Sequence, residues 1–280
     1  MSWGDGPFCA FDLETTSVDP ETTRIVTASV VTIVGATPRV RSWLTDVDGE
    51  EIPAEATAVH GITTERARAH GTPAARAVKE IRDALASAMY DGIPLVIFNA
   101  PFDLTGLDRE CRRHDIEPLG AARVPLRVID PLVLDRAVDK YRKGSRKLVD
   151  IARHYGITLT EDEAHTSDGD CLATARVAWC LAKRTPVGRM DIDQLQMFQR
   201  EAHARWADGF EDYLRKLKAA EANLAYWDAA GHVDACLSLT GSQSCTCGPA
   251  EDGSGVAAAQ AVHIPRHWPI VPFELVGAEA

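Results

Sequence analysis

The chain has 280 residues, of which 45% are apolar, and its formal net charge at pH 7 is −11. This length and composition fit a globular protein that buries a core large enough for an enzyme. The acidic net charge argues against a protein that coats nucleic acid or an anionic membrane with its whole surface, although it allows a local basic groove. No apolar run approaches the roughly 18 residues of a membrane helix, and the first residues lack the features of a signal peptide, so a cytoplasmic location is expected.

The first predicted element is a strand in the stretch FCAFDLETT, residues 8–16. Asp12 and Glu14 interrupt its apolar residues at period-two spacing, so both carboxylates face the same side. Two acids on one face of a buried strand repel each other and lose hydration, and a divalent metal is the usual compensation. The alternative is an edge strand whose acids point into water, and the D-x-E spacing alone favours that simpler interpretation.

A hairpin is predicted next, because β-branched residues dominate 25–34 and a further strand over 38–44 follows through Gly35. Residues 52–63 contain too few periodic apolar residues for an element of their own, so we expect a surface loop there. Within this loop, His60 either contacts a substrate or closes a turn.

Helices and strands then alternate along the chain. Apolar residues at helical spacing predict a helix over 73–89, with Thr72 as its cap and Pro73 at its first position. Buried strands are predicted over 93–98 and 126–130. This alternation implies parallel pairing, with helices packed on the sheet.

A helix between those two strands is predicted to begin near Pro101. It places Asp103 in its first turn, where the positive end of the helix dipole keeps the carboxylate ionised. Asn99, just before this helix, orients either the strand end or a substrate, or only satisfies backbone groups.

A basic segment lies between Arg136 and Lys147, with six basic residues against one acid. Such a run is usually a solvated surface. Here it leads toward other candidate site residues in an otherwise acidic chain, so contact with phosphates is an equal alternative, through Arg142, Lys143 and Arg146. A short helix over 148–155 is expected to follow it.

The next helix is predicted over 171–182, capped by Asp168 or Ser167. His165 and Asp170 are five residues apart and cannot share a helix face. His165 must therefore lie on the preceding loop, and Asp170 in the first helical turn, if the two are to meet. Asp168 competes with Asp170 as a metal ligand, but the role of helix cap is favoured.

The C-terminal part is predicted to contain a long helix over 191–227, kinked at Asp208 and Gly209, and then an irregular tail that packs back through Trp268 and Phe273. This divides the chain into residues 1–187, 188–230 and 231–280. The tail holds a loose group of Cys and His residues whose C-x-C spacing is unlike a zinc knuckle, so free thiols are favoured over structural zinc. That group is His232, Cys236, Cys245, Cys247, His263 and His267. Cys9, Cys171 and Cys180 lie in apolar segments and are expected to be reduced.

Acids and one histidine thus gather at strand ends and helix starts: Asp12, Glu14, Asp103, His165 and Asp170. Three or four carboxylates around two divalent cations form the arrangement that in-line hydrolysis of a phosphodiester needs. Oxygen ligands favour Mg²⁺ or Mn²⁺ over zinc. A histidine on a loop is suited to take the proton from the attacking water.

Five segments resemble a known family in the same order, over roughly residues 7–185. They are FDLETT at 11–16, VHGIT at 59–63, NAPFD at 99–103, KLVDIARHYGI at 147–157, and the H-x₄-D pair of His165 and Asp170. The chain resembles the DEDD exonucleases of the ribonuclease H-like fold, in the histidine subgroup that includes the proofreading epsilon subunits of bacterial DNA polymerase III. The resemblance implies an α/β fold, with a mixed sheet flanked by helices, and the C-terminal helical extension and irregular tail predicted above lie beyond its span.

The same resemblance implies roles for individual residues. Asp12, Glu14, Asp103 and Asp170 would hold two metal ions, with Asp12 bridging both, and His165 would act as general base. The resemblance suggests that His60 would touch the terminal nucleotide, and Thr15, Thr16 and Asn99 are further candidates for contact with the substrate. The implied activity removes nucleotides one at a time from a 3′ end and releases nucleoside monophosphates. The family usually has alanine where this chain has Ser167 and Cys171, and because both side chains are small the geometry is expected to be kept.

Several questions of function stay open at this point. We expect a magnesium-dependent 3′-5′ exonuclease on single-stranded or frayed DNA ends, in proofreading or repair. Trimming of RNA ends is the second enzymatic interpretation. A non-catalytic, polymerase-associated nucleic-acid-binding module would be expected to have lost one or more of the acids, and all four are present. A DNA polymerase subunit and a second copy of the chain are the candidate protein partners, and no membrane partner is expected.

Overall fold

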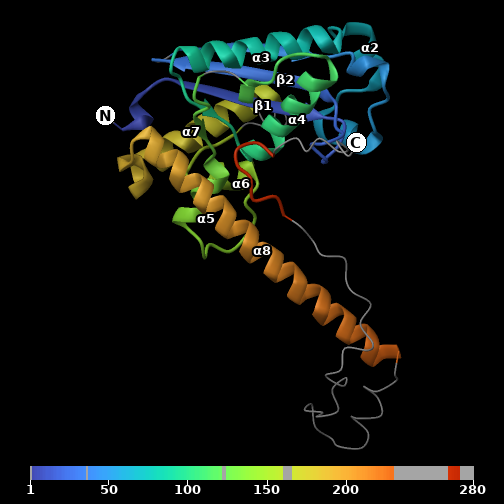
Figure 1. The fold of residues 1–280 in the computed structure, drawn as a ribbon, viewed down its shortest axis with the longest axis vertical. Coiled ribbons are helices and arrows are strands. Elements are labelled where there is room, and N and C mark those ends of the chain that lie inside the picture. Colours follow the sequence, from blue (N-terminus) through green and yellow to red (C-terminus); the bar gives the residue numbers. More distant parts are fainter. Residues whose placement is uncertain (1, 36, 122–123, 160–165, 230–263, 272–280) are drawn as a thin grey trace, which may run out of the picture. The chain divides into compact units, whose positions relative to one another are not determined.

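The structure is a computed structural model, and it describes the chain except for residues 1, 36, 122–123, 160–165, 230–263 and 272–280 (Figure 1). The side chains of residues 219–229 are also outside the description. The chain divides into two compact units, one formed by residues 1–203 with 267–280 and the other by residues 204–266. The division into 1–187, 188–230 and 231–280 stays a prediction.

The first unit is built on a five-stranded mixed sheet of order β3-β2-β1-β4-β5. The strands are β1 (Phe8–Thr15), β2 (Ile25–Val34), β3 (Thr37–Leu44), β4 (Leu95–Val96) and β5 (Val128–Ile129). The first three pair antiparallel, while β4 and β5 pair parallel to β1 and to each other. The predicted mixed sheet is therefore confirmed, and Gly35 turns the predicted hairpin at a φ of 71° that suits glycine.

Helices flank this sheet and continue to the C-terminal part. The α-helices are α1 (Ala54–His60), α2 (Thr64–His70), α3 (Ala74–Tyr90), α4 (Ala100–Arg113), α5 (Pro131–Val138), α6 (Leu148–His154), α7 (Ser167–Arg184) and α8 (Ile192–Ala229). Short 3₁₀ helices cover Trp3–Asp5, Val47–Gly49, Leu119–Ala121 and Pro186–Arg189. None of the helices in the described ranges is long and apolar enough to cross a membrane.

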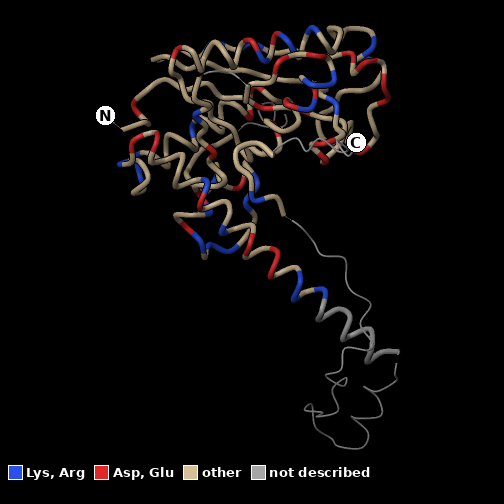
Figure 2. The backbone as a smooth tube through the Cα atoms, in the orientation of Figure 1, with Lys and Arg blue, Asp and Glu red and all other residues tan. Residues whose placement is uncertain are grey.

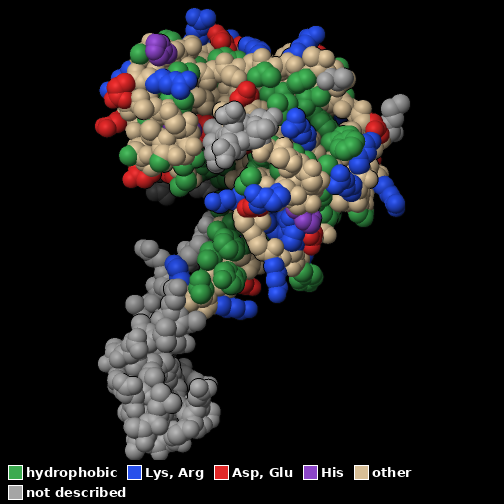
Figure 3. Space-filling view, turned by 180° about the vertical axis from the view of Figure 1, so that it is seen from behind, with side chains coloured by type: hydrophobic (Ala, Val, Ile, Leu, Met, Phe, Trp, Pro, Cys, Tyr) green, Lys and Arg blue, Asp and Glu red, His purple; other side chains and the backbone are tan. Residues whose placement is uncertain are grey.

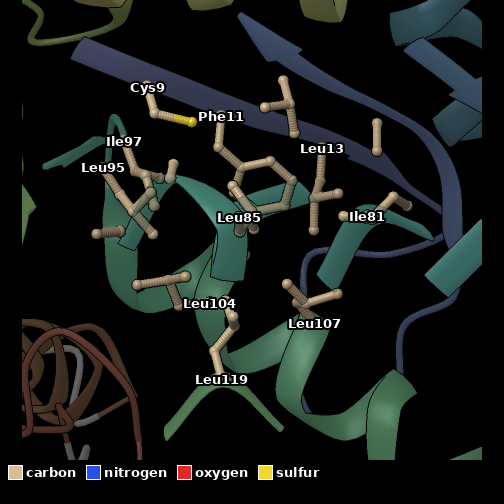
Figure 4. Close-up of a cluster of buried hydrophobic side chains, with 14 of the residues drawn as sticks. Cys9, Phe11, Leu13, Ile81, Leu85, Leu95, Ile97, Leu104, Leu107 and Leu119 are labelled. Carbon is tan, nitrogen blue, oxygen red and sulfur yellow. The ribbon is translucent and has the colours of Figure 1, made fainter. Parts of the chain in front are cut away.

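The alternation along β1 assigns its two faces to different helical layers. Cys9, Phe11 and Leu13 point toward α3 and α4, where they pack with Leu85, Leu104 and Leu107 (Figure 4). Phe8 and Ala10 pack in a second cluster, on the α6 and α7 side of the sheet. Asp12 and Glu14 continue the even-numbered series, so both face the α7 side.

The structure corrects the predicted surface loop over 52–63. This region contains the seven-residue helix α1, and it ends at Thr63, the cap of α2. Ile52 and Ile62 are buried at either end of α1, in a small cluster with Val47. One buried residue at each end of so short a helix leaves no repeating apolar pattern, which explains why periodicity missed it.

Smaller corrections concern helix ends and strand lengths. Thr166 caps α7 by accepting from the amide of Gly169, so neither Asp168 nor Ser167 is the cap. Thr72 does not cap α3, whose first amide instead donates to Asp46. Helix α8 runs through Asp208 and Gly209 as one element, with no break at the expected kink. Strands β4 and β5 are each two residues long, shorter than the predicted 93–98 and 126–130.

The tail packs back as predicted through Trp268, which is 5% exposed in the cluster formed by α3 and α4. Phe273 and the group of tail Cys and His residues lie outside the described residues, except His267. Cys9, Cys171 and Cys180 are buried free thiols, as expected, and so is Cys111.

Candidate active site

Three carboxylates converge beside the C-terminal end of β1. Asp12 and Glu14 project from β1, and Asp170 projects from the first turn of α7. Each of the three offers a carboxylate oxygen, and these oxygens all lie within 4.8 Å of one another. Helix α7 packs along β1 and β2, which brings its first turn to the face that carries the two strand acids (Figure 1).

Asp103 joins this group from the neighbouring edge of β1. It lies in the first turn of α4, is 4% exposed, and accepts a hydrogen bond of 3.0 Å from the backbone amide of Leu13. Strand β4 pairs with β1 only at Cys9 and Ala10. Because β4 ends there, the Leu13 amide lacks a strand partner on that edge, and the Asp103 carboxylate takes its place.

Burial and neighbouring acids raise the proton affinity of Asp12, Glu14 and Asp103. Burial raises the pKa of Asp12 well above its ordinary value, and the nearby charges of Asp103, Asp170 and Glu14 raise it further. Burial and then Asp170 raise the pKa of Glu14 to about 7. Burial also raises the pKa of Asp103, although the bond from Leu13 opposes this.

This donor set fits divalent cations. Carboxylate oxygens are the ligands that Mg²⁺ and Mn²⁺ prefer, and a cation would remove the repulsion that the buried acids otherwise carry. Cys171 lies next to Asp170 in the chain, but its thiol donates to the backbone carbonyl of Ser29, and burial raises the pKa of this thiol well above the ordinary value. Thiolate coordination of a softer metal is therefore disfavoured.

The metal-free protein should lose stability as pH rises, because of these shifts. Glu14 in the unfolded chain ionises near its ordinary pKa of 4.5, while in the folded protein it ionises near 7. Between these values the folded state holds a proton that the unfolded chain has released, so the free energy of unfolding falls with rising pH, on the order of 1–3 kcal/mol. The shift at Asp12 has the same sign.

Melting temperatures in EDTA at pH 5 and pH 7.5 measure this loss. We expect a lower value at pH 7.5, which Mg²⁺ restores. The control variant Glu14→Gln cannot ionise at this position, so its melting temperature should fall less over the same interval. A melting temperature that rises toward pH 7.5 in EDTA would contradict the assigned repulsion.

The two departures from the family pattern both contact Ser29 of β2. The hydroxyls of Ser29 and Ser167 lie 2.7 Å apart in a buried hydrogen bond, and the thiol of Cys171 donates to the Ser29 carbonyl at 3.3 Å. Ser29 pairs with Asp12 across the strands. These side chains therefore fasten the first turn of α7 to the sheet beside the metal-binding acids.

Sequence reasoning missed Asp130, which orders the start of α4 through hydrogen bonds to its backbone. Its carboxylate accepts from the amides of Asn99 at 3.1 Å and Ala100 at 2.9 Å, and it also caps α5 through Leu132 and Val133. Asp130 is fully buried, and its position before Pro131, at the end of a strand, was the available signal for a helix cap.

The predicted substrate residues are distributed around this site. Thr15 bonds to the carbonyl of Ser17, and the hydroxyl of Thr16 accepts from the amide of Arg24, so both order the loop after β1. Asn99 adopts a left-handed conformation just before α4. Contact of these side chains with a substrate stays a prediction.

His60 closes a turn at the end of α1. Its Nδ1 accepts a hydrogen bond of 3.1 Å from the amide of Ile62. Its Nε2 is buried and has no hydrogen-bond partner among the described residues, and burial lowers the pKa of His60. One nitrogen therefore has the structural role, and the other stays open to the predicted contact with substrate.

The basic segment is partly structural. Arg142 and Arg146 both pair with the carboxylate of Asp135, which is fully buried and also accepts from the hydroxyl of Tyr155. These arginines hold the segment to α5 and α6. Lys143 is exposed, so it is the member of the predicted trio that is best placed to meet a phosphate.

His165 lies in 160–165, outside the described residues. Its role as general base stays a prediction. The described chain resumes at Thr166, the cap of α7, four residues before Asp170.

Comparison with known proteins identifies the family. Residues 9–178 match the family model named exonuclease (RNase T). The chain belongs to this exonuclease family. The match includes Asp12, Glu14, Asp103 and Asp170 and agrees with the span of the resemblance in sequence.

Two curated relatives support the assignment of this chain to the exonuclease family. A DNA polymerase III subunit epsilon-like protein of Rhodobacter capsulatus is 36% identical over 172 residues, which cover 60% of this chain and 22% of that protein. An uncharacterised exonuclease, CP81, of Escherichia phage 186 is 33% identical over 141 residues, covering 47% of this chain and 68% of that protein. The exonuclease thus spans only about a fifth of the length of the first relative.

Solved structures of exonuclease I share the fold. One matches with a TM-score of 0.55 at 22% identity, over 65% of this chain and 42% of that one. Exonuclease I of E. coli in complex with a dA16 oligonucleotide matches with a TM-score of 0.55 at 21% identity, over 71% of this chain and 44% of that one. The predicted ribonuclease H-like sheet flanked by helices is confirmed by these matches.

Proposed function

We propose that this exonuclease hydrolyses phosphodiester bonds one at a time from the 3′ ends of single-stranded or frayed DNA, releasing nucleoside monophosphates. The observation that carries the proposal is the convergence of the oxygens of Asp12, Glu14 and Asp170 within 4.8 Å, with Asp103 at the adjacent edge of β1. Membership of an exonuclease family supports a nuclease rather than another metal-dependent hydrolase.

Each acid would have a defined part in this reaction. Asp12, Glu14, Asp103 and Asp170 would hold two Mg²⁺ or Mn²⁺ ions. When bound, such a pair lowers the pKa of the attacking water and stabilises the leaving oxygen. His165 would take the proton from that water. The fastening of α7 by Ser29 and Ser167 keeps Asp170 beside Asp12 throughout.

DNA is the proposed substrate because the structural neighbours include complexes of exonuclease I with dT13 and dA16 oligonucleotides. The epsilon-like name of one relative supports a role beside a DNA polymerase, in proofreading or repair. Cytoplasmic location and a polymerase partner stay predictions.

The decisive experiment uses DNA and RNA oligonucleotides labelled at either end, incubated with Mg²⁺, Mn²⁺ or EDTA. A 5′ label should report a ladder that shortens from the 3′ end, while a 3′ label should be released at once as a mononucleotide. EDTA should abolish both. Cleavage in EDTA, or no cleavage with either metal, would overturn the proposal, and faster degradation of RNA would assign the substrate to RNA ends.

Substitutions in the basic segment separate binding from stability. Lys143→Ala should leave the free energy of unfolding within about 0.5 kcal/mol, because the side chain is exposed. It should reduce the slope of log affinity for single-stranded DNA against log salt by about 0.7, the effect of one lost phosphate contact.

The matched control is Arg142→Ala, which removes a partner of buried Asp135 and should cost about 1–3 kcal/mol of stability. Equal salt slopes for Lys143→Ala and the unmodified protein would remove Lys143 from the proposed binding surface.

A further inference from the structure

The loop that follows β1, residues 16–24, is held in one shape by its own hydrogen bonds. The pairing of β1 with β2 shifts register between Glu14 and Thr15, so the residues beyond that point need other support. Thr23 supplies part of it, because its hydroxyl accepts from the amide of Ser17 at 3.0 Å and donates to the Ser17 carbonyl at 3.2 Å. The loop begins just after a candidate metal ligand and a predicted substrate residue, so its shape affects how a substrate end is held.

Helix α4 holds this loop through two ion pairs. The guanidinium of Arg109 binds the carboxylate of Glu21 with two parallel hydrogen bonds, from Nε to Oε2 at 2.7 Å and from Nη2 to Oε1 at 2.8 Å. Arg24, at the end of the loop, pairs with Glu110 at 3.3 Å. Asp103 lies in the first turn of the same helix. The helix that presents a candidate metal ligand therefore also positions the loop after β1.

Arg109 makes its contact with the loop from a buried position. Acidic and basic residues follow one another in this half of α4, and the neighbouring Asp108 also binds Arg109, at 2.7 Å (Figure 2). Figure 3 shows lysine and arginine side chains that stand out from the surface, where water competes for an ion pair. The side chain of Arg109 is only 4% exposed. Because Asp108 already compensates this buried charge, the pair with Glu21 serves to fix the loop.

The C-terminal segment 267–271 binds the same guanidinium. This segment belongs to the same compact unit as α4 and is part of the red stretch in Figure 1. The amide of Val271 donates to the hydroxyl of Thr105 at 3.1 Å, and the carbonyl of Val271 accepts from Nη2 of Arg109 at 3.1 Å. Thr105 and Arg109 lie one turn apart on one face of α4, so Val271 bridges that turn. Trp268, buried in the core, anchors the segment.

We propose that Arg109 is a positioning residue that couples the C-terminal segment 267–271 to the loop 16–24 and so sets how tightly a substrate 3′ end is held. The part of this that concerns substrate rests on the proposed function. Nη2 carries two N–H groups, one for Glu21 and one for Val271. Because a guanidinium is rigid and planar, one that turns away from Val271 also loses its alignment with Glu21. Release of the C-terminal segment should therefore loosen the loop.

Steady-state kinetics of Glu21→Gln measure the effect on the substrate. This change removes the charge that Arg109 binds and keeps the shape of the side chain. KM for single-stranded DNA should rise about 5- to 20-fold, the effect of one lost charge-assisted contact. The value of kcat and the Mg²⁺ requirement should be unchanged, because strand pairing with β2 still holds Glu14. Arg109→Lys keeps a charge without the fork and should act in the same direction. The control Asp83→Asn breaks an ion pair with Lys79 on α3 and should leave KM unchanged.

Hydrogen exchange of the full-length, metal-free protein measures the coupling without any nuclease activity. Peptides that cover the loop 16–24 should exchange faster in Glu21→Gln than in the unmodified protein, because the loop opens more often. Thr105→Val removes the acceptor of the Val271 amide and should also speed exchange of this loop, although its lost hydrogen bond is to the C-terminal segment. The double variant Thr105→Val/Glu21→Gln should exchange no faster in the loop than Glu21→Gln, since both changes act through Arg109.

The outcomes separate this inference from the proposed function. An unmodified protein that degrades no DNA would overturn the proposed function, while the exchange measurements would still decide the coupling. Active protein in which Glu21→Gln changes neither KM nor exchange of the loop would overturn the role of Arg109. Faster loop exchange in Glu21→Gln, with the original rate in Thr105→Val, would overturn the coupling to the C-terminal segment.

Discussion

Asp12→Asn should abolish exonuclease activity and make the metal-free protein more stable. The expected loss in kcat is at least about 10³-fold, because several kcal/mol of transition-state stabilisation depend on the metal site and each 1.36 kcal/mol is a factor of ten. The gain in stability without metal comes from the removal of a repelling charge. Asp12 is enclosed together with three other acids that raise its pKa, and an amide of the same shape removes that repulsion.

Single-turnover rates with Mg²⁺ and melting curves in EDTA measure the two effects. Each kcal/mol of removed repulsion should raise the melting temperature by about 2–4 °C. Asp168→Asn is the matched control, because Asp168 is an exposed acid of the same helical turn that lies outside the carboxylate cluster. It should change neither quantity. An active Asp12→Asn protein, or one that is less stable than the original in EDTA, would contradict the assignment of Asp12 to the metal site.

The parts of this fold that sequence patterns predicted are those with a strong local signal. Strand β2 has the predicted bounds, because ten residues rich in β-branched side chains end at a glycine whose positive φ makes the turn. Strand β1 places Asp12 and Glu14 on one face, because side-chain alternation is a property of the strand alone. Their convergence with Asp103 and Asp170 followed from the order of strands and helices.

The parts that sequence patterns missed depend on partners that are distant in the chain. Arg142 and Arg146 belong to a basic run that looks solvated in the sequence, and only the fold reveals that both pair with buried Asp135. Helix α1 shows no periodicity, because one buried residue at each end anchors it. From the sequence, Asp130 is recognisable only as the cap of the helix that follows it. In the structure its carboxylate also accepts from the amides of Asn99 and Ala100, about 30 residues earlier.

Asp130→Ala should lower both stability and catalysis, although Asp130 is not among the metal-binding acids. The buried amide of Ala100 would lose its acceptor, as would those of Asn99, Leu132 and Val133, at about 1–3 kcal/mol for each buried donor left unpaired. A total loss of about 3–5 kcal/mol is expected, since part of the helix end can relax toward water.

The catalytic effect should follow from the position of Asp103. Helix α4 begins at Ala100, so release of that amide frees the turn that aims Asp103 at β1. In the folded fraction, kcat should fall about 10- to 100-fold and the Mg²⁺ concentration for half-maximal activity should rise, with little change in KM, as when the support of a metal ligand is removed.

Trp268→Phe is the appropriate control for this network. It keeps a large ring in the same buried site and removes only the indole N–H that reaches Asp130 at 3.4 Å, so stability should fall by about 0.5–1.5 kcal/mol and the Mg²⁺ requirement should be unchanged. Asp130→Ala with reduced stability but the original kcat and Mg²⁺ requirement would limit Asp130 to a structural role. If the Mg²⁺ requirement rises in Asp130→Ala and is unchanged in Trp268→Phe, Asp130 is a positioning residue. It then holds the metal ligand Asp103 in place through its hydrogen bonds at the starts of α4 and α5.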